Sequence, residues 1–181
     1  VTPEHIRNAG IKSILDGKTA YTANYGLIEL RRGISEYLEK RFDLSYHPEK
    51  EVLVTVGGSE AIDLCMSALI DDGDEPLFVS YAPLAIAQRG VPVVIETKEE
   101  DSFKLTPQAL KAAITPKTKL LVFSYPNNPT GAIMTKEEME EIAAILRDTN
   151  IVVISDEIYA ELTYGRRHVS IATLPGMRER T

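Results

Sequence analysis

The sequence predicts an α/β fold built on a doubly wound, mostly parallel sheet. Short runs of apolar and often β-branched residues recur along the chain, and such runs are typical of strands buried on both faces. Segments with apolar residues at helical spacing separate most of these runs. Because strands that alternate with helices usually pair in parallel, this order indicates one sheet with helices on both faces.

The first third of the chain is predicted to contain two helices and one strand. Residues 3–16 have the pattern of a helix, with Thr2 as its N-cap and Pro3 at the first helical position. A polar, aromatic loop follows and ends at Gly26, after which residues 27–42 carry apolar side chains at helical spacing. Residues 52–56 (Val-Leu-Val-Thr-Val) are expected to form a strand.

The rest of the chain alternates regularly between the two kinds of element. A Gly-Gly-Ser-Glu turn at residues 57–60 leads into a helix that is expected to end near residue 70. The elements predicted after it are a strand at 91–95, a helix at 106–114, a strand at 119–124, a helix at 136–147 and a strand at 151–155.

Composition limits the classes of protein to which the chain can belong. Its 181 residues suffice for one domain or slightly more. The net charge of −7 argues against a nucleic-acid partner, and no apolar run approaches the roughly 20 residues of a membrane span. A single cysteine and the lack of a recognisable signal peptide favour the cytoplasm. Because the chain begins without Met, we expect residues before Val1.

Polar side chains follow two of the predicted strands. Residues 125–131 read Tyr-Pro-Asn-Asn-Pro-Thr-Gly, and residues 156–159 read Asp-Glu-Ile-Tyr. Because the carboxyl ends of parallel strands meet at one crevice, we expect Asn128, Asp156 and Tyr159 to lie together there. The glycines of the 57–60 turn would let an anion approach the free N–H groups of the following helix. Alone, each motif also fits an ordinary turn or a helix start.

In this order and over nearly all 181 residues, the motifs resemble the class I/II pyridoxal-phosphate-dependent aminotransferases of fold type I. The resemblance implies that residues 1–181 form most of the large domain that binds pyridoxal 5'-phosphate. It also implies that the chain is incomplete, because the N-terminal segment, a short strand near residues 75–76 and the C-terminal small domain of the family have no counterpart in it.

The resemblance assigns cofactor-binding roles to particular residues. Gly58, Ser59 and Glu60 match the phosphate-binding turn. Asp156 matches the carboxylate that keeps the pyridine nitrogen protonated, which makes the ring a better electron sink. Asn128 and Tyr159 match the pair that hydrogen-bonds the phenolate oxygen, a role for which Asn127 is the weaker candidate.

Two aromatic residues complete this set. Phe78 matches the aromatic that stacks on the cofactor ring, with Tyr81 close by, and Tyr21 matches a tyrosine that reaches the phosphate of the partner subunit in a homodimer. The lysine that bonds the cofactor is expected beyond Thr181, because no lysine lies between Asp156 and that residue. The covered chain should therefore contain no catalytic residue and be inactive alone.

The sequence around Glu75 departs from the family pattern. A Gly-Asp-Glu turn at residues 73–75 runs directly into Pro-Leu-Phe at residues 76–78, where the family has a short apolar strand first. We expect this strand to be absent and the backbone to be interrupted near Glu75 and Pro76, with a natural deletion as the alternative.

The expected activity is transfer of an amino group between an amino acid and a 2-oxo acid by ping-pong chemistry. Two alternatives share the fold: a C–S lyase of the cystathionine β-lyase kind, and the cofactor-sensing domain of a transcription regulator. An unrelated nucleotide-binding fold has less support, since no Gly-x-Gly-x-x-Gly follows a strand. His5, His47 and His168 are scattered without metal-site spacing, so no metal is expected. The specific amino-acid substrate is not predicted.

Overall fold

The computed structural model describes residues 1–78 and 81–181. Its α-helices are α1 (Glu4–Leu15), α2 (Ile28–Phe42), α3 (Gly58–Leu69), α4 (Ala82–Ala87), α5 (Pro107–Ala113) and α6 (Lys136–Arg147). Its strands are β1 (Glu75–Phe78), β2 (Val93–Val94), β3 (Thr118–Ser124) and β4 (Val152–Asp156). Four short 3-10 turns are η1 (Glu99–Asp101), η2 (Ala160–Leu162), η3 (Ile171–Thr173) and η4 (Arg178–Arg180).

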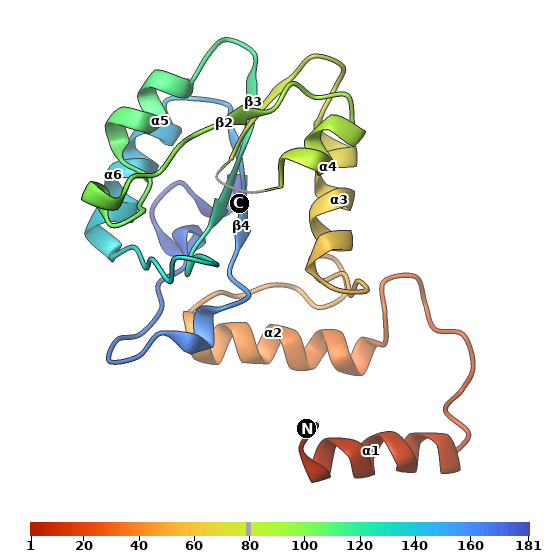
Figure 1. Cartoon of the computed structure of the whole chain (residues 1–181). Coiled ribbons are helices and arrows are strands. Elements are labelled where there is room, and N and C mark those ends of the chain that lie inside the picture. The colour runs from red at the N-terminus through yellow and green to blue at the C-terminus, as the bar shows by residue number, and fades with distance from the viewer. Residues whose placement is uncertain (79–80) are drawn as a thin grey trace.

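The four strands form one parallel sheet in the order β2-β1-β3-β4. Helices α5 and α6 cover one face, and α3 and α4 cover the other (Figure 1). The side chains of β3 explain why both faces must be covered. Leu121 and Phe123 pack toward α5 and α6, while Leu120 and Val122 pack toward α3 and α4. The predicted doubly wound, parallel α/β fold is thus confirmed.

The caps of α5 and α6 follow the local sequence. Thr106 caps α5 by accepting a hydrogen bond from the Ala109 N–H, and Thr135 forms a capping box with Glu138 at the start of α6. The predicted cap of the first helix is wrong. Pro3 occupies the N-cap position of α1, and no side chain caps the helix.

The prediction that a strand is missing near residues 75–76 is also wrong. Glu75–Phe78 forms β1, which lies between β2 and β3 in the sheet, and its pairing with β3 shifts register between Glu75 and Pro76. Proline cannot donate to a ladder and usually argues against a central strand. Here the register shift accommodates Pro76, and burial of Leu77 and Phe78 on opposite faces favours the strand.

The strand predicted at residues 52–56 does not form. Val54 donates one backbone hydrogen bond to the Tyr25 carbonyl, and the side chain of Val56 is almost completely exposed. A strand needs a neighbouring strand for its ladder, and an apolar cavity separates Val52 and Leu53 from the edge of β4. The β-type sequence is present, but no described strand is placed to pair with it.

The N-terminal segment makes few contacts with the rest of the chain. Helix α1 buries none of its residues and lies apart from the sheet, joined to α2 by an extended loop (Figure 1). Ile6, Ile11, Ile14 and Leu15 of α1 are all exposed. In contrast, the C-terminal turns η3 and η4 pack on α6 and bury Ile171 and Met177 completely or nearly so.

Candidate functional site

The carboxylate of Asp156 is the centre of the candidate site. It ends β4 and lies directly beside Ser124, the last residue of β3. The Tyr81 hydroxyl donates to Asp156 Oδ2 at 2.6 Å, and Ser124 Oγ donates to the same oxygen at 3.3 Å. The hydrogen bond to this carboxylate raises the pKa of Tyr81 to about 12, because loss of the phenol proton would place two negative charges together.

Asn128 and Tyr159 meet as their positions after two strands predict. The Asn128 amide donates to the Tyr159 hydroxyl at 3.1 Å, and the Asn128 side chain is exposed. Asn127 is buried instead, where it donates to the Ser124 carbonyl and accepts from Thr130. The adjacent asparagines therefore divide their roles: Asn127 shapes the turn, and Asn128 presents a polar group beside Tyr159.

The N-terminus of α3 carries unused hydrogen-bond donors. Gly57 is the N-cap with a φ of 85°, and no side chain caps the helix. Within the described residues, the backbone N–H groups of Gly58, Ser59 and Glu60 donate to no protein acceptor. The Glu60 carboxylate accepts from the Val56 N–H, so it points back at the turn. The free N–H groups and the helix dipole together favour an anion at this position.

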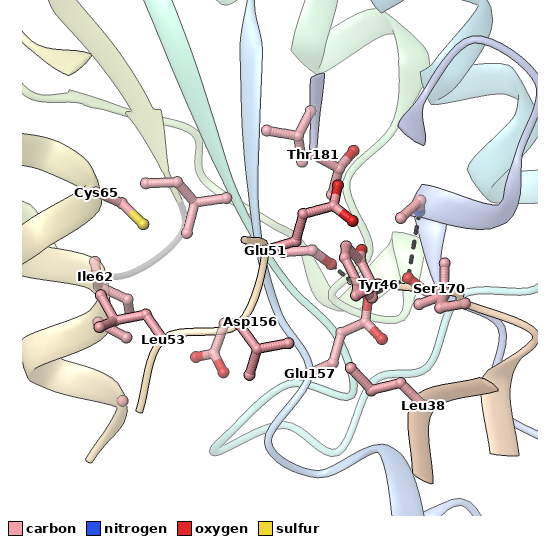
Figure 2. A pocket seen from close by; sticks show the side chains of 18 of the residues that line it. Leu38, Tyr46, Glu51, Leu53, Ile62, Cys65, Asp156, Glu157, Ser170 and Thr181 are labelled. Atoms are coloured by element: carbon pink, nitrogen blue, oxygen red, sulfur yellow. Dashed lines mark hydrogen bonds between the residues drawn. The ribbon is translucent and has the colours of Figure 1, made fainter. Parts of the chain in front are cut away.

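Gly58 and Asp156 line one cavity of about 570 Å³. The cavity runs along the edge of β4 and is bounded by α3 and by the segment that contains Val52 and Leu53. Figure 2 shows that Asp156 turns toward Leu53 and Ile62, whereas Glu157 turns toward Tyr46 and Ser170. The two neighbouring carboxylates therefore face different surroundings.

The two aromatic residues of the predicted cofactor-binding set lie in different surroundings. Phe78 is buried in the core beside Met66 and Val122, with 1% of its surface exposed, so its ring cannot stack on a ligand in this conformation. The reason is the formation of β1, which draws Phe78 into the sheet. Tyr21 is fully exposed in the loop between α1 and α2. The role of Tyr21 at the phosphate of a partner subunit therefore stays a prediction.

Three contributors to the site region have weak signals in the sequence. Tyr81 stands out there only as a neighbour of Phe78, yet its hydroxyl donates to Asp156. Ser124 could have been found, because a hydroxyl at the carboxyl end of a strand faces the same crevice as Asp156. His168 had no local signal: it is buried and contacts Glu157 only through the tertiary fold.

Other kinds of site have no support in the part of the chain that the structure describes. No group of three or more His, Cys, Asp or Glu side chains there is arranged to hold a metal ion. No described helix is long and apolar enough to cross a membrane.

The family model for aminotransferase class I and II matches residues 2–180 of the chain. The chain belongs to this family. A putative aminotransferase, YugH, of Bacillus subtilis (strain 168) is 47% identical to it over 186 residues, covering all of this chain and 48% of that protein. An aspartate aminotransferase of Pyrococcus abyssi (strain GE5 / Orsay) is 42% identical to the chain, and the alignment covers 99% of this chain and 48% of that protein.

Solved structures of aminotransferases agree with the sequence matches. An aromatic aminotransferase from Pyrococcus horikoshii OT3 superposes with a TM-score of 0.96 at 42% identity, covering 99% of this chain and 50% of that one. The chain thus spans about half the length of the relatives it matches. Because the YugH alignment spans 186 residues and this chain has 181, that relative carries at least five residues without a counterpart here.

Proposed function

We propose that the protein containing this chain is a pyridoxal-phosphate-dependent aminotransferase that moves an amino group between an amino acid and a 2-oxo acid. The observation that carries the proposal is the donor and acceptor set at the carboxyl edge of the sheet: one carboxylate, an amide–phenol pair and an uncapped helix N-terminus. The relatives described above are named as aminotransferases, which favours amino transfer over the lyase and regulator alternatives.

This set fits pyridoxal phosphate, the cofactor of the family, group by group. The free N–H groups of Gly58, Ser59 and Glu60 suit its phosphate. Asp156 suits a protonated ring nitrogen, because a carboxylate in a partly buried place stabilises a positive charge beside it. Asn128 and Tyr159 supply donors for the phenolate oxygen. When bound, the cofactor supplies an electron sink for the substrate carbon.

Tyr81 is the aromatic residue best placed beside this ring. Its hydroxyl already donates to Asp156, so it orients that carboxylate. A ligand nitrogen that takes the Asp156 oxygen must displace or share this hydrogen bond. We therefore assign Tyr81 the place beside the cofactor that the sequence pattern assigned to Phe78.

The cofactor-bonding lysine and a second subunit complete the proposal. The lysine is proposed to lie beyond Thr181, since the residues between Asp156 and Thr181 contain none. The exposed apolar side chains of α1 are proposed to pack on a second copy, because a 12-residue helix is marginal in water without tertiary contacts. Such a homodimer would bring the exposed Tyr21 toward the phosphate site of the partner.

Replacement of Asp156 in the full-length protein tests the activity. In Asp156→Asn we expect amino transfer to be nearly abolished, because the neutral amide no longer holds a proton on the ring nitrogen. Cofactor affinity should fall only in part, since the phosphate contacts at α3 remain. Single-turnover conversion of an amino acid to its 2-oxo acid would be measured, with Asp101→Asn at an exposed position as the control. A near-normal rate in Asp156→Asn would contradict the proposal.

A further inference from the structure

Glu157 is the focus of a partly buried polar cluster next to the candidate site. Ser155 Oγ donates to Glu157 Oε1 at 2.7 Å and Ser170 Oγ donates to the same oxygen at 2.6 Å. His168 Nε2 lies 2.7 Å from Glu157 Oε2. The His168 side chain is 2% exposed and that of Glu157 is 20% exposed. A carboxylate oxygen accepts hydrogen bonds when it is ionised, so this contact suits a His168 ring that carries a proton on Nε2.

The cluster joins segments that are distant in the sequence. Ser155 and Glu157 belong to the end of β4, whereas His168 and Ser170 lie on the segment before η3. The ring of His168 also packs edge-on against Phe42, the last residue of α2, with 5.6 Å between ring centroids. Glu157 is thus tied to two other parts of the fold at the point where β4 ends.

The position of Glu157 in the chain gives this anchor a consequence for the site. Asp156 precedes it directly and Tyr159 follows two residues later. Figure 2 shows that the Asp156 and Glu157 side chains leave the chain in different directions. Fixing the Glu157 side chain on one side therefore fixes the shared backbone and the direction of Asp156 on the other. The Ile158 N–H donates to Asp156 Oδ1 at 3.3 Å, so the same short segment also contacts the carboxylate.

We propose that Glu157, held by Ser155, His168 and Ser170, is a positioning residue that sets the direction of Asp156 and Tyr159 toward the cofactor. If packing alone were required, a partly buried carboxylate with an imidazole and two hydroxyls would be a costly way to fill this space, because apolar side chains could do so without desolvation of polar groups. The inference rests on the function proposed above.

The test compares Glu157→Ala and Glu157→Gln with Glu161→Gln in the full-length protein. Glu161 is the matched control, because it anchors the same loop to α2 through Arg41 and Tyr37 but does not adjoin Asp156. The readouts are affinity for pyridoxal phosphate, affinity for inorganic phosphate, and hydrogen exchange of the backbone amides from 156 to 160.

Glu157→Ala should weaken pyridoxal-phosphate binding by about tenfold or more, as expected when a group that needs near-ångström alignment loses its support. Binding of inorganic phosphate should stay unchanged, because the N-terminus of α3 is untouched. Exchange at residues 156–160 should accelerate. Glu157→Gln retains an acceptor for both serines and should recover most of the affinity, and Glu161→Gln should leave both affinities unchanged.

His168→Leu provides a second route if Glu157→Ala does not fold, because it removes the polar partner of Glu157 but keeps an apolar side chain beside Phe42. It should accelerate exchange at residues 156–160 and weaken cofactor binding, and it should leave the affinity for inorganic phosphate unchanged. Unchanged cofactor affinity and unchanged exchange in Glu157→Ala and His168→Leu would overturn the positioning role, as would an equal loss of both affinities in these two variants. If Asp156→Asn still abolishes transfer in that case, the proposed function stands without it.

Discussion

The N-terminal region (residues 1–56) and the sheet region (residues 75–180) differ sharply in how they use their apolar residues. From β1 to η4, Leu, Ile, Val and Met side chains on both faces of the sheet are buried, and the main cluster continues into the C-terminal turns. From Val1 to Val56, many comparable side chains are exposed, including all four large aliphatic residues of α1 named above. The sheet region therefore has a continuous apolar core. Many apolar side chains of the N-terminal region are left exposed to solvent.

The difference shows which candidate site residues have positions set by packing. Asp156, Asn128 and Tyr159 belong to the sheet region, so their relative positions depend on the sheet. Tyr21 belongs to the N-terminal region, where its side chain is fully exposed. Four predictions test this contrast, in order of decreasing expected effect.

The largest effect is expected from removing core volume. Ile142 of α6 is completely buried, so Ile142→Ala should lower the free energy of unfolding by about 2–5 kcal/mol. Ile11→Ala in α1, where the side chain is 57% exposed, is the matched control and should change it by no more than about 0.5 kcal/mol. Urea unfolding of the chain measures both. Similar losses of unfolding free energy in the two variants would contradict the contrast between the N-terminal region and the sheet region.

A smaller effect on stability is expected at a helix cap in the sheet region. Thr135→Ala breaks the capping box of α6 and should cost about 1 kcal/mol of unfolding free energy. Thr19→Ala, in the exposed loop after α1, should cost almost nothing. The same denaturant titration applies. A neutral Thr135→Ala would mean that packing alone determines where α6 begins.

The contact between α2 and the segment after β4 should depend on pH. Hydrogen bonds from Arg41 and Tyr37 lower the pKa of Glu161 from 4.5 to about 2. The folded-state pKa is below the unfolded one, so this contribution is fully present above pH 4.5 and is lost as pH falls toward about 2. Glu161→Gln should flatten the stability profile in this interval, as measured by thermal unfolding at each pH. An unchanged slope would show that the exposed pair contributes nothing measurable.

The smallest effect on stability is expected from deleting residues 1–15. Helix α1 buries no residue, so the unfolding midpoint of the remaining chain should stay nearly constant. In the full-length protein, the same deletion should weaken self-association, which analytical ultracentrifugation would measure. A midpoint that falls as far as that of Ile142→Ala would show that α1 is part of the core.

Much of the fold could be predicted because its signals are local. The apolar pattern predicted for the strand at 119–124 and the helical spacing predicted for 136–147 depend on residues next to one another, and β3 and α6 confirm both. The predictions for residues 52–56 and 75–78 are wrong in opposite senses: a strand is expected at the first segment and none at the second. Strand formation depends on a neighbouring strand to pair with, and a local sequence pattern does not contain that neighbour. Residues 52–56 have strand composition without a paired strand, and residues 75–78 contain a proline but are paired on both sides.

The sequence by itself determined the parallel α/β class, the order of its main elements and the polar residues at the ends of two strands, because periodicity and turn chemistry act over a few residues. The tertiary structure decided which groups touch. It placed Tyr81 and Ser124 on Asp156, moved Phe78 into the core and gathered His168 and Ser170 around Glu157. These contacts join residues from 11 to 75 positions apart, and only the folded chain brings such residues within hydrogen-bond distance.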